Sequence, residues 1–233
     1  KSLCGNRRPI AAFLREVERQ LQRLPGVRSA AVSSTLPLDG GVTRVALDAT
    51  GLRSPLPDGR VRAATKAVTS SYFQTMGVAP IVGGLFLDDE DRKVAIVNRT
   101  LARALWGHEQ SAVGQGLRLG GGEWWRVVGV VPDTRQVLTV PASPEIYVPI
   151  RLEPPVRASL VVRTSSPPPA AAPGLRRAIH ALDRDLALFD VISMDDIVAS
   201  YLPAPFIAAF ALLALSSLLL GSLGLYAAVA FQV

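Results

Sequence analysis

Residues 206–231 read FIAAFALLALSSLLLGSLGLYAAVAF, and this uncharged stretch divides the chain into two parts of different character. All 25 Lys and Arg and all 19 Asp and Glu lie at or before Asp196. As a helix rising about 1.5 Å per residue, the stretch would exceed the roughly 30 Å hydrocarbon core of a bilayer. A body of about 200 residues is too small to bury such a helix on every side. We therefore expect one transmembrane helix at 203–233, truncated at its C-terminal end.

Small side chains recur along one face of this predicted helix, at spacings of 3, 4, 3 and 4 residues. They are Ala214, Ser217, Gly221, Gly224 and Ala228. In lipid, helices associate through close backbone approach, which small residues permit. The stripe predicts a surface that packs against another membrane helix, although Gly, Ala and Ser are also simply common in such helices.

The charged part of the chain shows alternating helix and strand patterns. An amphipathic helix is expected behind Pro9 and a strand at 27–33, and a second strand–helix–strand set is expected across 160–192. Between these sets lie short strands with Gly and Pro turns, including a hairpin around Gly120–Gly122. The predicted fold class is α+β with two lobes: residues 1–41 and 155–200 form an α/β lobe that lacks its first strand upstream, and residues 42–154 form a β-rich inserted lobe.

The sequence offers little for catalysis or cofactor binding. It has no G-x-x-x-x-G-K-[ST] phosphate loop and no G-x-G-x-x-G fingerprint, which are the common nucleotide motifs. Cys4 is the one cysteine and His108 and His180 the two histidines, and none stands at metal-ligand spacing. Asp88–Asp91 lacks the pattern of a calcium loop and is interpreted as a solvated loop. We expect no catalytic, cofactor or metal residue, and hence no enzyme.

Charge and aromatic residues give two further expectations. The net charge of +6 comes from Arg residues scattered among acids, a pattern that does not favour nucleic-acid binding. Trp124 and Trp125 are neighbours on a predicted strand, so one should be buried and the other exposed.

Several segments in order resemble the FtsX-like ABC transporter permeases with their MacB-like periplasmic core domain. The similar segments are Tyr72-Phe73 with Met76-Gly77, Val94–Asn98 followed by Leu101-Ala102-Arg103, Val127–Val131 with Asp133 and Arg135, Glu145–Pro149, and Gly224-Leu225-Tyr226. The pattern is most similar to the duplicated orphan permeases of acidobacterial type. Two positions depart from it: Gly83-Gly84-Leu85-Phe86 stands where Gly-Arg-x-Phe is usual, so that Gly84 replaces an Arg, and Ala227 stands where a Gly is usual.

The resemblance implies a porter-like α/β lobe, a bacterial inner-membrane location, and residues 1–200 on the periplasmic or extracytoplasmic side. It also implies a permease subunit that couples movement of its membrane helices to export or extrusion of a substrate. The implied partners are the lipid bilayer, other transmembrane helices of the full-length permease, a separate ABC ATPase subunit and a second permease half in a dimer. The alternative is a membrane-anchored extracytoplasmic binding or signalling domain without a transport role.

Overall fold

The computed structural model describes residues 7–36, 43–53, 61–87, 92–134, 141–155, 157–183, 191–201 and 204–230. The chain separates into two compact units, Lys1–Val191 and Ile192–Val233. The first holds all the described strands and five of the helices, and the second holds two helices. The units are therefore described one at a time.

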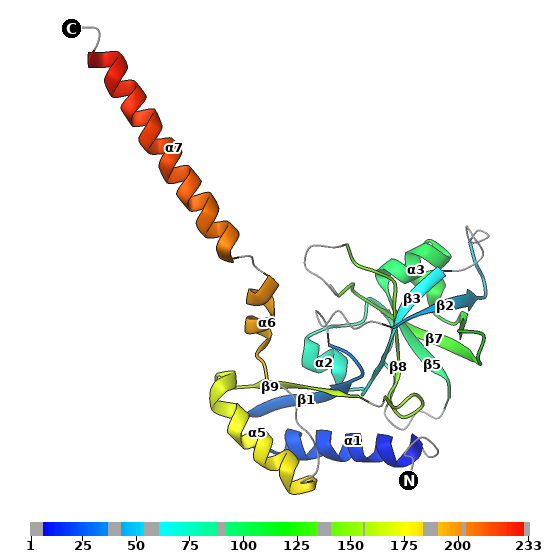
Figure 1. Ribbon diagram of the computed structural model, residues 1–233. Helices are drawn as coiled ribbons and strands as arrows, with labels where there is room; N and C mark the ends of the chain where they lie inside the picture. Colours follow the sequence, from blue (N-terminus) through cyan, green and yellow to red (C-terminus); the bar gives the residue numbers. More distant parts are fainter. Residues whose placement is uncertain are drawn as a thin grey trace. The chain divides into compact units, whose positions relative to one another are not determined.

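Helices and strands alternate along the first unit, as drawn in Figure 1. In chain order the elements are α1 (Arg7–Gln22), β1 (Val27–Ser33), β2 (Arg44–Ala49), β3 (Val61–Val68), α2 (Tyr72–Met76), β4 (Val82–Gly83), β5 (Val94–Asn98), α3 (Arg99–Trp106), α4 (Glu109–Ala112), β6 (Gly116–Leu119), β7 (Trp124–Val131), β8 (Glu145–Pro149), β9 (Ser159–Thr164) and α5 (Pro168–Leu182).

Six of the strands close on themselves into a small barrel. Their order is β2-β6-β7-β5-β8-β3, and β2 also pairs with β3, which completes the ring. Most neighbours are antiparallel, but β3 pairs with β8 and β5 with β7 in parallel. Strand β3 also pairs through Val68 with Ser33 of β1, so β1 and β9 extend the same sheet beyond the barrel.

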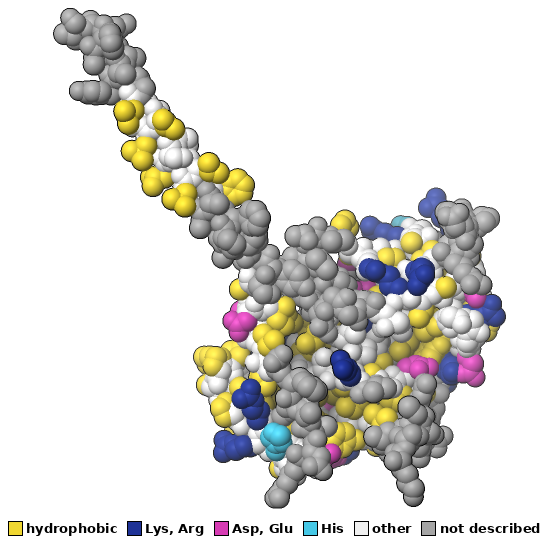
Figure 2. Space-filling view, in the orientation of Figure 1, with side chains coloured by type: hydrophobic (Ala, Val, Ile, Leu, Met, Phe, Trp, Pro, Cys, Tyr) yellow, Lys and Arg dark blue, Asp and Glu magenta, His cyan; other side chains and the backbone are white. Residues whose placement is uncertain are grey.

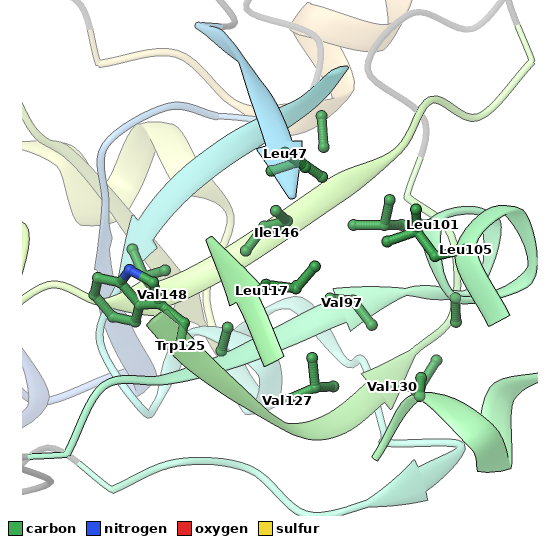
Figure 3. Packing of buried hydrophobic residues seen from close by; sticks show 14 of the residues in the cluster. Leu47, Val97, Leu101, Leu105, Leu117, Trp125, Val127, Val130, Ile146 and Val148 are labelled. Atoms are coloured by element: carbon green, nitrogen blue, oxygen red, sulfur yellow. The ribbon is translucent and has the colours of Figure 1, made fainter. Parts of the chain in front are cut away.

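The barrel interior is filled by apolar side chains that alternate with outward residues along each strand. Figure 3 shows Leu117 of β6, Trp125 and Val127 of β7 and Ile146 of β8 in the same packed cluster as Leu101 of α3. Trp125 is 3% exposed and its neighbour Trp124 is 47% exposed, which confirms the prediction that the two rings point to opposite faces. The hydrophobic stretches of the central sequence thus build one shared core.

The short strand β4 lies against β7 through a contact that only glycine permits. Gly83 and Gly129 are register partners, and a Cβ on Gly129 would overlap the backbone carbonyl oxygen of Gly84. Gly83 has φ +74°, a left-handed conformation that favours glycine, and a Cβ there would overlap the carbonyl oxygen of Val128. Gly129, the glycine within Val127–Val131, is therefore required by the close approach of β4 to β7.

Helices α1 and α5 cover the part of the sheet formed by β1 and β9. The sequence pattern predicts that the strands of the two helix–strand sets share one sheet, and residues Val27–Ser33 do pair antiparallel with Ser159–Thr164. The apolar face of α1, with Val17 and Leu21, packs with Ile179 of α5 over Ala30. The division into one lobe at 1–41 with 155–200 and a second lobe at 42–154 stays a prediction. One continuous sheet runs through strands of both parts.

Helix α5 corrects one expectation. From its sequence alone, the Pro- and Ala-rich segment 165–174 predicts a linker between the strand and the helix of the second set, but the helix already begins at Pro168. Proline suits the first turn of a helix because the backbone N–H groups there have no intrahelical acceptor. Most of the strand expected at 186–192 lies outside the described residues, and residues 191–193 have no regular structure.

The second unit consists of α6 (Met194–Tyr201) and α7 (Ala204–Ala230). Sequence analysis did not foresee α6, although Ser193 and Asp196 carry its signal: the Ser193 hydroxyl accepts a hydrogen bond from the Asp196 backbone N–H at 3.1 Å. Side chains of α7 are described from Phe210 to Leu223. Among the described residues, no helix is sufficiently long and apolar to cross a membrane.

Candidate functional site

The described part of α7 is an apolar helix whose side chains are not buried in this chain. Its large hydrophobic residues are between 56% and 73% exposed: Phe210, Leu212, Leu213, Leu215, Leu218, Leu219, Leu220 and Leu223. Figure 2 shows hydrophobic side chains along the described length of this helix. Soluble monomers rarely expose a contiguous apolar surface of this kind, so α7 is a candidate interaction element.

The polar side chains of α7 satisfy their hydrogen bonds within the helix. The Ser216 and Ser217 hydroxyls each donate to the Leu213 carbonyl oxygen at 2.9 Å, and the Ser222 hydroxyl donates to the Leu219 carbonyl oxygen at 2.8 Å. A hydroxyl that is bonded to its own helix needs no water or partner side chain. These serines therefore do not make the surface of α7 hydrophilic.

The predicted packing stripe is partly visible. Ala214, Ser217 and Gly221 lie in the described, exposed part of α7, and a Cβ on Gly221 would meet no heavy atom within 4 Å. Gly224 and Ala228 belong to the same helix, but their side chains lie outside the described residues. That this stripe binds another helix stays a prediction.

A charged cluster that sequence analysis missed lies buried between β3 and β8. Lys66 and Glu145 are both 0% exposed, and Lys66 Nζ lies 3.4 Å from Glu145 Oε2. The same carboxylate oxygen accepts hydrogen bonds from the Tyr147 hydroxyl and from the Thr134 hydroxyl, the latter at 2.8 Å. The available signal was a lysine inside the otherwise apolar end of the strand VRAATKAV.

Burial favours the uncharged forms of Lys66 and of two tyrosines. Burial lowers the pKa of Lys66, and the nearby Glu145 carboxylate opposes this shift. Burial also raises the pKa of Tyr147 and of Tyr72, and the charge of Glu145 adds to both shifts. The ion pair joins strands β3 and β8. Because neither of its members is exposed, it presents no charged group to a substrate.

Asn98 organises the end of β5, in the segment that carried part of the family resemblance. Its side-chain oxygen accepts hydrogen bonds from the backbone N–H of Leu101 and of Glu145, each at 3.0 Å. Its side-chain nitrogen donates to the Ser143 carbonyl oxygen at 2.9 Å. One buried side chain thus caps α3 and positions the beginning of β8.

The residues considered for metal or catalytic chemistry are dispersed. His108 Nδ1 lies 2.8 Å from the Gln110 side-chain oxygen, and His180 lies on the exposed side of α5. Asp88–Asp91 lie outside the described residues. Within the part of the chain that the structure describes, no three His, Cys, Asp or Glu residues gather closely enough to hold a metal ion.

The described residues form a mixed α/β domain built around a small barrel, and an apolar helix follows this domain in the sequence. The family model described as MacB-like periplasmic core domain matches residues 5–181. The chain belongs to this family, whose members include periplasmic domains of ABC-type permeases. No curated protein matches the chain.

Two solved structures share the fold. The periplasmic region of MacB from Actinobacillus actinomycetemcomitans aligns with a TM-score of 0.52 and 14% identity, covering 72% of each chain. The extracellular domain of the noncanonic ABC-type transporter YknZ from Gram-positive bacteria aligns with a TM-score of 0.52 and 19% identity, covering 74% of this chain and 83% of its own. Both are extracytoplasmic domains, as the resemblance implied.

Proposed function

We propose that this chain is the extracytoplasmic core domain and one membrane span of a permease subunit in an ABC-type system. The observation that carries the proposal is the MacB-like core match over 5–181 together with the unburied apolar side chains of α7. In this role the body follows movements of the membrane helices and acts on an extracytoplasmic substrate during export or extrusion. ATP hydrolysis then belongs to a separate subunit.

Lipid is the proposed environment of α7. Leu, Ile, Phe and Val each favour insertion at the helix centre by about 0.3 to 0.6 kcal/mol. A span also requires every polar group to be satisfied internally, and Ser216, Ser217 and Ser222 meet this requirement by bonding to carbonyls of their own helix. The whole uncharged run supports the same proposal.

The membrane proposal is tested by charge substitution in the intact protein. We expect Leu219→Arg to reduce membrane integration, because an arginine at the helix centre costs about 2.5 to 3.5 kcal/mol on the insertion scale. Leu219→Ile is the matched control and should integrate normally. Integration is measured as the carbonate-resistant membrane fraction, and equal fractions for both variants would contradict the span.

The proposed topology places residues 1–200 outside the cytoplasm of a bacterial inner membrane. Alkaline phosphatase fused after Asp196, in the full-length protein with its own preceding chain, should be active. An inactive fusion, with a cytoplasmic reporter active at the same position, would reverse the topology.

The stripe of Ala214, Ser217, Gly221, Gly224 and Ala228 is the proposed contact with another helix of the permease or of a second permease half. Gly221→Leu should weaken this assembly, because a large side chain separates the backbones. It should leave the described fold intact, since a Cβ on Gly221 touches nothing within 4 Å. Cross-linking that is equal for Gly221→Leu and Leu220→Ile would favour a helix that only tethers a binding or signalling domain.

A further inference from the structure

Three outward side chains form a row across neighbouring strands of the barrel wall. Asp48 of β2 is the register partner of Arg118 of β6, and Arg118 is the register partner of Trp124 of β7. The Trp124 side chain is 47% exposed, and among the described residues of the first unit no other aromatic side chain is exposed. The row therefore presents an aromatic surface to solvent, with a charged pair beside it.

The Trp124 ring is held in place by its neighbours. The Arg118 guanidinium carbon lies 5.2 Å from the ring centre, and the same guanidinium group pairs with Asp48 Oδ2 through Nε at 2.9 Å and Nη2 at 2.7 Å. Gly116 leaves room for the ring, because a Cβ there would lie only 3.1 Å from Trp124 Cε3. A ligand that stacks on this ring does not have to immobilise it first, which reduces the entropic cost of binding.

Polar groups with further hydrogen-bonding capacity lie around the ring. A carboxylate can accept about four hydrogen bonds, and both contacts of Arg118 go to Oδ2 of Asp48, so Oδ1 is available to a ligand. Gln115 accepts a hydrogen bond from the Thr50 hydroxyl at 3.1 Å through its side-chain oxygen, and its side-chain nitrogen can donate to a ligand. An acceptor and a donor thus accompany the aromatic surface.

This combination of groups distinguishes between classes of ligand. An apolar side chain placed on the ring would remove water from Asp48 and Gln115 without replacing its hydrogen bonds, which costs free energy. An anion would meet the negative face of the indole and the Asp48 carboxylate. A pyranose sugar avoids both penalties, because its C–H face can stack on the ring while its hydroxyls pair with the carboxylate and the amide.

We infer that the outer face of β2, β6 and β7 binds a pyranose sugar, which stacks on Trp124 and forms hydrogen bonds with Asp48 Oδ1 and the Gln115 amide. The sugar hydroxyls donate to the carboxylate and accept from the amide. Arg118 positions the ring and the carboxylate. This inference concerns the body of the protein and does not depend on the proposed span.

The test uses the full chain in nanodiscs, with empty nanodiscs as background, and saturation-transfer-difference NMR with four probes. Chitotriose and maltotriose carry pyranose rings, mannitol carries hydroxyls on an open chain, and an oligoproline peptide carries apolar rings. We expect saturable binding of at least one trisaccharide, with the largest transfer to protons on one face of its rings. Equal binding of mannitol would overturn the stacking, and equal or tighter binding of oligoproline would replace the sugar by a protein partner.

Variants then locate the binding. Trp124→Ala should weaken binding of the trisaccharide by about tenfold or more, since stacking on an aromatic side chain is typically worth this much. Trp124→Phe keeps a ring and should bind more tightly than Trp124→Ala. Gln115→Ala removes one hydrogen bond and should weaken binding by about threefold to tenfold.

Leu87→Ala is the matched control, because Leu87 is a 65% exposed apolar side chain outside the row. It should bind the trisaccharide normally. Near-ultraviolet circular dichroism checks that each variant keeps its fold. Absence of saturable binding of both trisaccharides, or equal loss in Trp124→Ala and Leu87→Ala, would overturn the site.

Discussion

At the scale of single residues, the buried Lys66–Glu145 pair is the most unusual feature of the body. Two charges removed from water cost several kcal/mol each, and the cost is offset only by close pairing and further hydrogen bonds. Here the Glu145 carboxylate is held by Lys66 at 3.4 Å and by the hydroxyls of Thr134 and Tyr147. The pair joins two parallel strands, so its removal should affect stability.

We predict that Lys66→Met lowers the free energy of unfolding by about 3 to 5 kcal/mol, because it removes the lysine that is paired with the buried Glu145 carboxylate. Urea denaturation followed by circular dichroism measures the change. The double variant Lys66→Met with Glu145→Gln removes both charges and should be more stable than Lys66→Met alone. A double variant that is equally or less stable would contradict this account of the pair.

The raised pKa values of Tyr72 and Tyr147 predict sensitivity to alkali. Both hydroxyls keep their protons in the folded protein above pH 10.0, the ordinary value, whereas the unfolded chain loses them. The unfolded state then binds fewer protons, so stability falls as pH rises above about 10. A spectroscopic titration should show two tyrosines that ionise only when the protein unfolds. In Tyr147→Phe the pH dependence of unfolding above pH 10 should become shallower, and an unchanged slope would count against this.

At the scale of secondary-structure elements, backbone contacts decide where two segments meet. The β4–β7 pair exists because Gly129 and Gly83 have no Cβ, as the overlap with neighbouring carbonyl oxygens shows. Helix α3 is capped at its start by Asn98 and at its end by Gly107, which has φ +78°. The sequence indicates these positions as turns and helix caps. It does not indicate which strand each glycine will pack against.

We predict that Gly129→Ala lowers the free energy of unfolding by about 1 to 3 kcal/mol, the usual cost of overpacking. The added Cβ would overlap the Gly84 carbonyl oxygen, so β4 or β7 must shift. Gly84→Ala is the matched control, because a Cβ there meets nothing within 4 Å. Thermal unfolding should separate the two variants, and equal midpoints would show that β4 adjusts without cost.

At the scale of the whole molecule, the chain consists of a packed body and a helical unit that carries the unburied apolar surface. The body holds its own core in three clusters: inside the barrel, around the rings of Tyr72, Phe73 and Tyr147, and beneath α1 and α5. The ring centres in the second cluster lie 5.2 to 6.1 Å apart, within the favourable range for aromatic pairs. Among the described residues, none of Ile192–Val233 belongs to these three clusters.

A chain that ends at Val191 should therefore fold alone. We expect its thermal midpoint to lie within a few degrees of that of the full chain, because no residue of the three core clusters is removed. We also expect it to stay in the aqueous fraction, whereas the full chain partitions with membranes. Aggregation or loss of the near-ultraviolet circular dichroism signal would show that the body needs Ile192–Val233 for its stability.

Much of this protein was determined by local sequence patterns. The amphipathic period of α1 and the alternation that separates Trp124 from Trp125 both followed from the sequence. So did membership of the family, because its segments occur in order along the chain. Such features depend on neighbouring residues, whose spacing is visible in the sequence.

Apart from the pairing of β1 with β9, the tertiary structure alone decided which distant segments meet. Closure of the barrel requires β2 to pair with both β6 and β3, and no local pattern specifies that choice. The Lys66–Glu145 pair and the contact between Gly83 and Gly129 join residues 79 and 46 positions apart. These contacts form because the whole core must be filled and every buried polar group paired, a requirement that acts on the folded chain and not on any single stretch of it.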